Sequence, residues 1–139
     1  METTRGIKSY VTQTVSLYLT AAELASRGFV VATTTRNAPG VDLMATSSDM
    51  GKTYGIQVKG NHWTGVKTFW LVGKRAKKDV APRLFYVFVN LKPPGERPEF
   101  YVVPSRIVAK HLWVGRGSSR GWYSFQREKR YLENWSLLH

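Results

Sequence analysis

Residues 8–27 show polar and apolar positions that repeat with the period of an α-helix. The polar side chains recur at steps of three and four residues, at Gln13, Ser16, Thr20, Glu23 and Arg27. Most other positions are apolar, and a helix with so narrow a polar stripe is expected to pack its apolar side against the rest of the protein. Gly28 then stands where a left-handed glycine commonly ends a helix.

Short runs of β-branched and apolar residues follow this helix. They predict strands at residues 29–34, 41–46 and 53–59, with a turn at 37–40. Residues 84–91 are almost wholly apolar or aromatic, which is typical of a central strand covered on both faces.

The second half of the chain is less regular. Residues 99–103 predict a further strand, and Pro104 and Ser105 begin a predicted helix. Residues 60–83 are not assigned to one type of element. The order of elements predicts one mixed sheet with helices packed against it, in the α/β or α+β class.

Length, composition and charge limit the class of protein and the kind of partner. The 139 residues fit a single domain, 1–139, and 42% apolar with 13% aromatic residues excludes intrinsic disorder. Lysine and arginine number 21 against nine acidic residues, a net charge of +12, which favours a polyanionic partner. The absence of cysteine excludes disulfides and thiolate zinc sites. No leader or membrane span is recognisable, so we expect a soluble, cytoplasmic protein with no membrane partner.

Basic residues gather in two stretches that are candidates for nucleic-acid binding. The candidate contacts are Lys67, Lys74, Arg75, Lys77, Lys78, Arg116 and Arg120. Such contacts would position DNA on the protein without reading its sequence, although a run of charge is often only a solvated face. The five tryptophans could stack on bases, but burial is the more frequent role of each.

Three polar residues are expected to converge on one hairpin. Gln57 and Lys59 are two apart in a predicted strand and therefore share a face. Asp42 begins the preceding strand, and antiparallel pairing would place it close to both. A carboxylate and an amide oxygen suit a hard cation such as Mg²⁺ or Mn²⁺, and a lysine can neutralise charge that develops on a phosphate. The alternative is a turn aspartate beside a solvated lysine.

These residues carry a resemblance. Pro39-Gly40-Val41-Asp42 followed by Ile56-Gln57-Val58-Lys59 resembles the active-site hairpin of the PD-(D/E)XK nuclease superfamily, which includes restriction endonucleases and Holliday junction resolvases. The leading helix before the first strand is similar to the opening of small, resolvase-like members. The resemblance implies a restriction-endonuclease-like core, a central mixed β-sheet flanked by helices in the order α-β-β-β-α-β.

The resemblance also implies roles for individual residues. Asp42, Gln57 and Lys59 would be catalytic, and Asp42, Gln57 and the carbonyl of Val58 would hold Mg²⁺ or Mn²⁺. Gln57 stands where the superfamily usually has an acid, and the first half of the helix lacks the usual glutamate. Glu23 is therefore a candidate accessory acid, close to the helix end.

Two functions follow as hypotheses. The first is a metal-dependent endonuclease that hydrolyses phosphodiester bonds of double-stranded or branched DNA in repair, recombination, restriction or defence. By analogy with the superfamily, cutting both strands implies a homodimer. The second is a catalytically inactive DNA- or RNA-binding module that keeps the nuclease fold.

Overall fold

The structure is a computed structural model that describes residues 2–34, 40–64, 68–115 and 123–139, with side chains from residue 8 onward. Its helices, strands and 3₁₀ turns (η) follow one another in the order α1 Glu2–Ser26, β1 Val30–Thr33, β2 Leu43–Thr46, β3 Thr53–Asn61, β4 Phe69–Val72, η1 Lys74–Lys77, β5 Leu84–Asn90, β6 Glu99–Pro104, α2 Ser105–Lys110, β7 Trp113–Val114, β8 Tyr123–Gln126, η2 Lys129–Tyr131 and η3 Trp135–Leu137.

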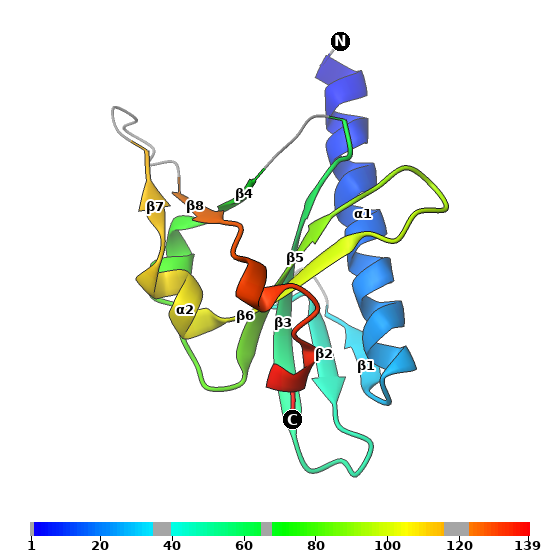
Figure 1. Cartoon of the computed structure of the whole chain (residues 1–139), viewed down its shortest axis with the longest axis vertical. Coiled ribbons are helices and arrows are strands. Elements are labelled where there is room, and N and C mark those ends of the chain that lie inside the picture. The colour runs from blue at the N-terminus through cyan, green and yellow to red at the C-terminus, as the bar shows by residue number, and fades with distance from the viewer. Residues whose placement is uncertain (1, 35–39, 65–67, 116–122) are drawn as a thin grey trace.

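The main sheet has five strands in the order β1-β2-β3-β5-β6. Strands β3 and β5 are parallel, and the other neighbouring pairs are antiparallel. This arrangement confirms the expected mixed sheet, and Figure 1 shows its strands running through the middle of the molecule. The connection between β3 and β5 contains strand β4 and a 3₁₀ turn, where the resemblance implied a helix.

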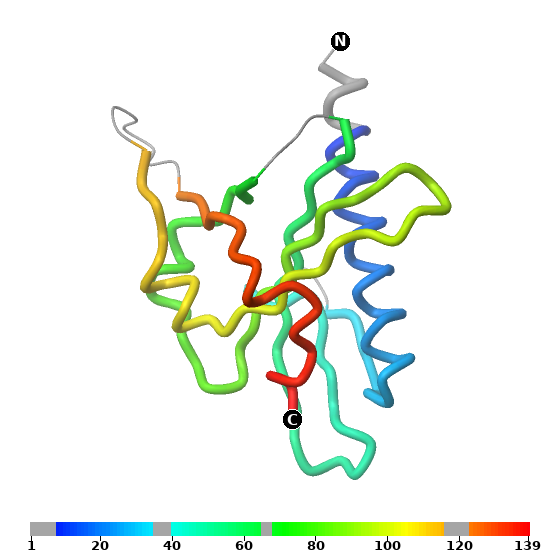
Figure 2. The backbone as a smooth tube through the Cα atoms, in the orientation of Figure 1, coloured from blue at the N-terminus to red at the C-terminus, as the bar shows by residue number. Residues whose placement is uncertain are grey.

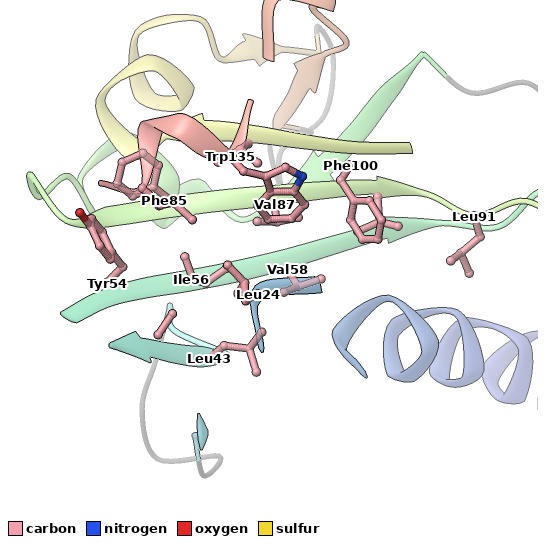
Figure 3. Close-up of a cluster of buried hydrophobic side chains, with 14 residues drawn as sticks. Leu24, Leu43, Tyr54, Ile56, Val58, Phe85, Val87, Leu91, Phe100 and Trp135 are labelled. Carbon is pink, nitrogen blue, oxygen red and sulfur yellow. The ribbon is translucent and has the colours of Figure 1, made fainter. Parts of the chain in front are cut away.

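Each face of the main sheet carries its own hydrophobic core. On one face, α1 and the C-terminal segment cover residues such as Ile56, Val58 and Val87, with Leu24 and Trp135 packed over them (Figure 3). On the other face, η1, α2 and a second sheet cover Tyr86 and Phe88. Residues 85–90 of β5 are all buried, which confirms the prediction of a central strand.

The second sheet is small and has the strand order β4-β8-β7. It brings together segments that are more than 40 residues apart in the chain, because β4 pairs with β8 from Phe69↔Gln126 to Val72↔Tyr123. Trp70 anchors it to the main sheet by donating its indole N–H to the Val89 carbonyl at 3.0 Å. In the tube view of Figure 2, this sheet and α1 lie on opposite sides of the main sheet.

The orientation of α1 is the reverse of the prediction along much of its length. Thr12, Ser16 and Thr20 face the sheet and are 7%, 0% and 0% exposed. Their hydroxyls donate to the carbonyls four residues earlier, at 2.9, 2.7 and 2.8 Å, so burial leaves none of them without a partner. Short side chains let the helix lie close to the backbone of β3, which is why the polar stripe is inside.

Close contact with β3 depends on Gly60. A Cβ at this position would lie 2.0 Å from Ser16 Oγ and 2.8 Å from Ser16 Cβ. The glycine therefore sets the distance between α1 and the strand that carries Gln57 and Lys59.

Crossing a membrane would require a long, apolar helix. Within the described residues, no helix combines the length and the apolar composition needed for such a span.

Candidate active site

The β2–β3 hairpin places Asp42 against the backbone of β3. Leu43 pairs with Ile56, and Asp42 directly precedes β2. The Asp42 N–H donates to the Ile56 carbonyl at 2.8 Å, and Asp42 Oδ2 accepts from the Val58 N–H at 2.7 Å. The carboxylate thus occupies the position where the next residue of a longer β2 would have paired with β3.

Gln57 and Lys59 project from β3 to one face, as expected from their spacing. The residues that alternate with them, Ile56 and Val58, are fully buried in the core beneath α1. Gln57 and Lys59 are themselves half-buried, beside Tyr86 and Phe88 of the parallel neighbour β5. The hairpin therefore places Asp42 against β3 at Val58, between Gln57 and Lys59 in the strand, with Pro39 of the motif outside the described residues.

Gln13 of α1 also reaches this hairpin. Its side-chain Nε2 donates to the Val58 carbonyl at 2.7 Å. This is the carbonyl that the resemblance assigned to the metal, and a carbonyl oxygen has a second lone pair for another partner. The sequence pattern predicted only that Gln13 belongs to a polar stripe. Gln13 does lie in the first half of the leading helix, where the superfamily usually has a glutamate, and this was the one sign that it could reach the hairpin.

Asp79 is a second residue that the sequence did not reveal. A Cβ added to Gly40 would lie 3.3 Å from Asp79 Oδ2 and 3.8 Å from Gln57 Oε1, so both oxygens approach one point. Gly40 has a φ of +77°, a conformation that favours glycine, and it leaves this space open. Asp79 is the single acid within a basic stretch, which in hindsight sets it apart.

Asp79 interacts with one basic side chain and with one buried tyrosine. Arg75 Nε lies 3.3 Å from Asp79 Oδ2, which ties the basic turn η1 to the hairpin. Tyr86, 2% exposed, has its pKa raised to about 12, first by burial and second by the negative charge of Asp79. The phenol of Tyr86 therefore stays protonated at neutral pH and acts as a neutral wall of the site.

Lys59 opens onto a groove between α1 and the second sheet. One cleft of about 640 Å³ is lined by Gln13, Lys59, Asn61, Leu71 and Trp113 among others. A second cleft of about 290 Å³ shares Gln13 and Asn61 with the first and continues to Lys8. We call the two together the Lys59 groove.

The walls of the Lys59 groove differ in character. The α1 side is polar, whereas Leu71 and Trp113 flank Ser124 in a row across the second sheet. Trp113 is 60% exposed. None of the described residues that line the groove is acidic, so its only charged groups are basic. Of the other tryptophans described, Trp70 and Trp135 are buried and Trp63 is exposed.

The predicted nucleic-acid contacts fall into two groups. Lys74, Arg75, Lys77 and Lys78 form an exposed basic surface on η1. Lys67, Arg116 and Arg120 lie outside the described residues.

Glu23 is not brought to the hairpin. It lies ten residues after Gln13, about 15 Å along the helix at 1.5 Å per residue. Its carboxylate contacts Arg27 at 3.1 Å and Arg97 at 2.9 Å. These contacts satisfy the charge of Glu23 in an ion-pair network near the C-terminal end of α1.

The donor atoms at the hairpin suit a hard cation. Asp42, Gln57 and the Val58 carbonyl offer only oxygen, which Mg²⁺ and Mn²⁺ prefer. The site has a low negative charge, because Gln13 and Gln57 are carboxamides. Accordingly, the described residues contain no group of three or more His, Cys, Asp or Glu side chains placed to hold a metal.

Comparison with solved structures finds a similar architecture. A bacterial homing endonuclease, I-Ssp6803I, aligns with a TM-score of 0.58 over 94% of this chain and 90% of its own. The chain has a nuclease-like fold. Sequence identity in this alignment is 18%, so the likeness is one of fold. No protein-family model matches the sequence, and no curated protein matches it.

Proposed function

We propose that this nuclease-like fold is a metal-dependent DNA endonuclease of the PD-(D/E)XK type, with Asp42, Gln57 and Lys59 as its catalytic residues. The observation that carries the proposal is the hydrogen bond from the Val58 N–H to Asp42 Oδ2, because it holds a carboxylate beside Gln57. The similar homing endonuclease is consistent with action on DNA.

Asp42, Gln57 and the Val58 carbonyl would hold Mg²⁺ or Mn²⁺, and we assign Asp79 to the same group as a second carboxylate. A bound cation supplies Lewis-acid activation of the scissile phosphate and of a water molecule. Asp42 is fixed by the Val58 N–H, and Gly40 leaves room for the oxygens of Gln57 and Asp79. Asp42 would therefore be in place before the cation binds, instead of being ordered at each turnover.

Lys59 would act on the reacting phosphate. Its ammonium shares the strand face of Gln57 and reaches the Lys59 groove, where it can orient the attacking water and neutralise charge on the phosphate. Hydrolysis joins the water oxygen to phosphorus and breaks one P–O ester bond, and the leaving oxygen takes a proton.

The DNA would be held by charge on both sides of the hairpin. The basic surface on η1 is linked to the site through the Arg75–Asp79 ion pair. The Lys59 groove begins at Lys59 of β3 and carries Lys8 and Lys59 with no described carboxylate. We therefore propose double-stranded or branched DNA as the substrate, used in repair, recombination, restriction or defence.

One observation favours a second function, a catalytically inactive nucleic-acid-binding module. Gln13 and Gln57 are carboxamides at positions where carboxylates would bind a cation more strongly. Such a module would bind DNA in a salt-sensitive manner without binding metal at Asp42.

Cleavage of a panel of DNAs tests the primary proposal. With Mg²⁺ or Mn²⁺, the chain is expected to cut at least one of duplex, branched and single-stranded DNA, and Asp42→Ala and Lys59→Ala are expected to lose the activity. Failure to cut any form, or equal cutting by both variants, would falsify the endonuclease.

The role assigned to Asp79 has a separate test in Mn²⁺ binding measured by electron paramagnetic resonance. Asp79→Asn is expected to weaken binding, whereas Asp49→Asn is the matched control because Asp49 binds Ser47 and Gly51 in the β2–β3 turn. Equal affinity of the Asp79 variant and the parent protein would remove Asp79 from the cation site.

A further inference from the structure

The side of α1 that faces away from the main sheet is apolar and exposed. Val11, Val15 and Tyr18 are 47%, 38% and 61% exposed, and Ala22 and Ala25 are exposed as well. Their spacing alternates between four and three residues, which is the spacing of the seam between two coiled α-helices. We call these five residues the α1 seam.

Rotation of α1 cannot bury this seam within the chain. The opposite side of the helix is already fixed against β3, where Ser16 meets Gly60 and Gln13 donates to the Val58 carbonyl. A continuous apolar stripe that the fold leaves exposed marks a surface for association.

The distribution of charge along α1 favours a second copy of this chain as the partner of the seam. The chain carries +12, yet no charged residue lies between Lys8 and Glu23. The two flanking charges are directed at the chain itself, because Lys8 donates to Thr64 at 2.8 Å and Glu23 pairs with Arg27 and Arg97. Two copies of so basic a chain repel each other over a screening length of about 8 Å, so they can approach through an uncharged surface.

We infer that a second copy of this chain packs on the α1 seam. The two helices run antiparallel about a two-fold axis, so that Val15 faces Tyr18 of the other copy and Val11 faces its Ala22. This register pairs a large side chain with a smaller one, and it also opposes the two helix dipoles. A parallel arrangement would instead place Tyr18 against Tyr18 and Lys8 against Lys8.

The inference rests on the surface of α1 and does not require nuclease activity. A dimer would give the proposed enzyme two active sites, one from each copy, so that each site could cut one strand of a DNA duplex. Metal binding at Asp42 and association through the seam can therefore fail independently of each other.

Sedimentation equilibrium tests the association. The parent chain is expected to show twice the monomer mass of 15.8 kDa. Val15→Glu and Tyr18→Glu are each expected to weaken the dimer about 100-fold or more, because an unpaired carboxylate would be buried at the seam. Val80→Glu is the matched control, since Val80 is 47% exposed and lies outside the seam. A monomeric parent chain, or equal weakening by Val80→Glu, would overturn the inference.

Disulfide cross-linking tests the register. The chain has no cysteine, so each introduced cysteine is its only thiol. A mixture of Val15→Cys and Tyr18→Cys chains is expected to cross-link efficiently, whereas Val11→Cys alone is not, because antiparallel helices hold its two copies far apart. Efficient cross-linking of Val11→Cys to itself would contradict the antiparallel arrangement.

Discussion

Asp42 illustrates how one side chain converts a hairpin into a site. Its carboxylate takes the Val58 N–H that a longer β2 would have bound, and its own N–H donates to the Ile56 carbonyl, so Asp42 is held against β3 next to Gln57. Residue spacing was enough to predict that Asp42 lies against the strand of Gln57 and Lys59. It could not reveal Gln13 or Asp79, because their positions depend on how α1 and η1 pack against β3 and not on local pattern.

Replacing Gln57 with glutamate should strengthen the cation site. Gln57→Glu adds a negative charge beside Asp42, and at short range such a charge is expected to raise Mn²⁺ affinity by about tenfold or more. Isothermal titration calorimetry measures the change, with Gln126→Glu as a control that adds the same charge at the exposed last residue of β8. Equal affinities for the two variants would show that Gln57 does not face the cation.

The raised pKa of Tyr86 predicts that the folded chain loses stability at alkaline pH. Its pKa of about 12 in the folded chain exceeds the ordinary value of 10.0, so between these pH values the unfolded chain ionises first and unfolding is favoured. Two units correspond to about 3 kcal/mol at most. Urea unfolding at pH 9 and pH 11.5 should show a smaller loss for Tyr86→Phe than for the parent. Identical losses would mean that Tyr86 ionises normally in the folded chain.

At the scale of elements, the hydrophobic pattern predicted the main sheet better than it predicted α1 or the second sheet. Strand β5 has one apolar residue after another, and both of its faces are buried, so pattern and environment agree. Helix α1 misleads because Ser16 and Thr20 satisfy their hydroxyls within the helix and can be buried without cost in hydrogen bonds.

The second sheet had no comparable local pattern. Strand β7 has only two residues, Trp113 and Val114, and β4, which ends at Val72, pairs with β8, which begins at Tyr123. Pairing over such intervals is a tertiary property, which residue periodicity does not encode.

The contact between α1 and β3 predicts a strong effect of Gly60→Ala. The new Cβ would overlap Ser16, and overpacking of this kind costs about 1–3 kcal/mol. Thermal unfolding measures the loss, and Ser16→Gly in the same chain should restore part of it. Gly73→Ala is the control, because nothing lies within 4 Å of its Cβ position and its φ is −72°. An equally mild effect at both glycines would argue against the close packing.

The exposed ring of Trp113 predicts a part for the second sheet in the proposed DNA binding. Stacking of a base on this exposed ring would contribute about 1–3 kcal/mol, so Trp113→Ala should weaken DNA binding by about 5-fold to 150-fold. Fluorescence anisotropy of a labelled DNA measures the affinity. Trp63→Ala is the matched control, since Trp63 is exposed but stacks on His62 and does not line the Lys59 groove. Loss of affinity in both variants alike would remove the specific role of Trp113.

The basic residues behind the net charge of +12 are unevenly distributed over the surface of the molecule. The basic turn η1 is tied to Asp79 by an ion pair from Arg75, and the Lys59 groove begins at Lys59 of β3, whereas the α1 seam is uncharged. One surface is thereby suited to a polyanion and another to a second copy of the chain. Composition alone indicated the polyanion but not the division of the surface.

The salt dependence of DNA binding tests this division. Removing one lysine that neutralises a phosphate should reduce the slope of log K against log salt by about 0.9, so Lys77→Gln with Lys78→Gln should reduce it by about 2. Lys52→Gln is the control, because Lys52 donates to the carbonyl of His139 at the C-terminus. An unchanged slope in the double variant would place the DNA elsewhere.

Anomalous diffraction from a crystal soaked in Mn²⁺ shows directly whether this hairpin binds a metal. We expect an anomalous peak in contact with Asp42, Gln57 and the Val58 carbonyl, with the Lys59 ammonium directed at the same space. Absence of a peak at this hairpin at saturating Mn²⁺, or a Lys59 side chain turned away from an occupied site, would contradict it.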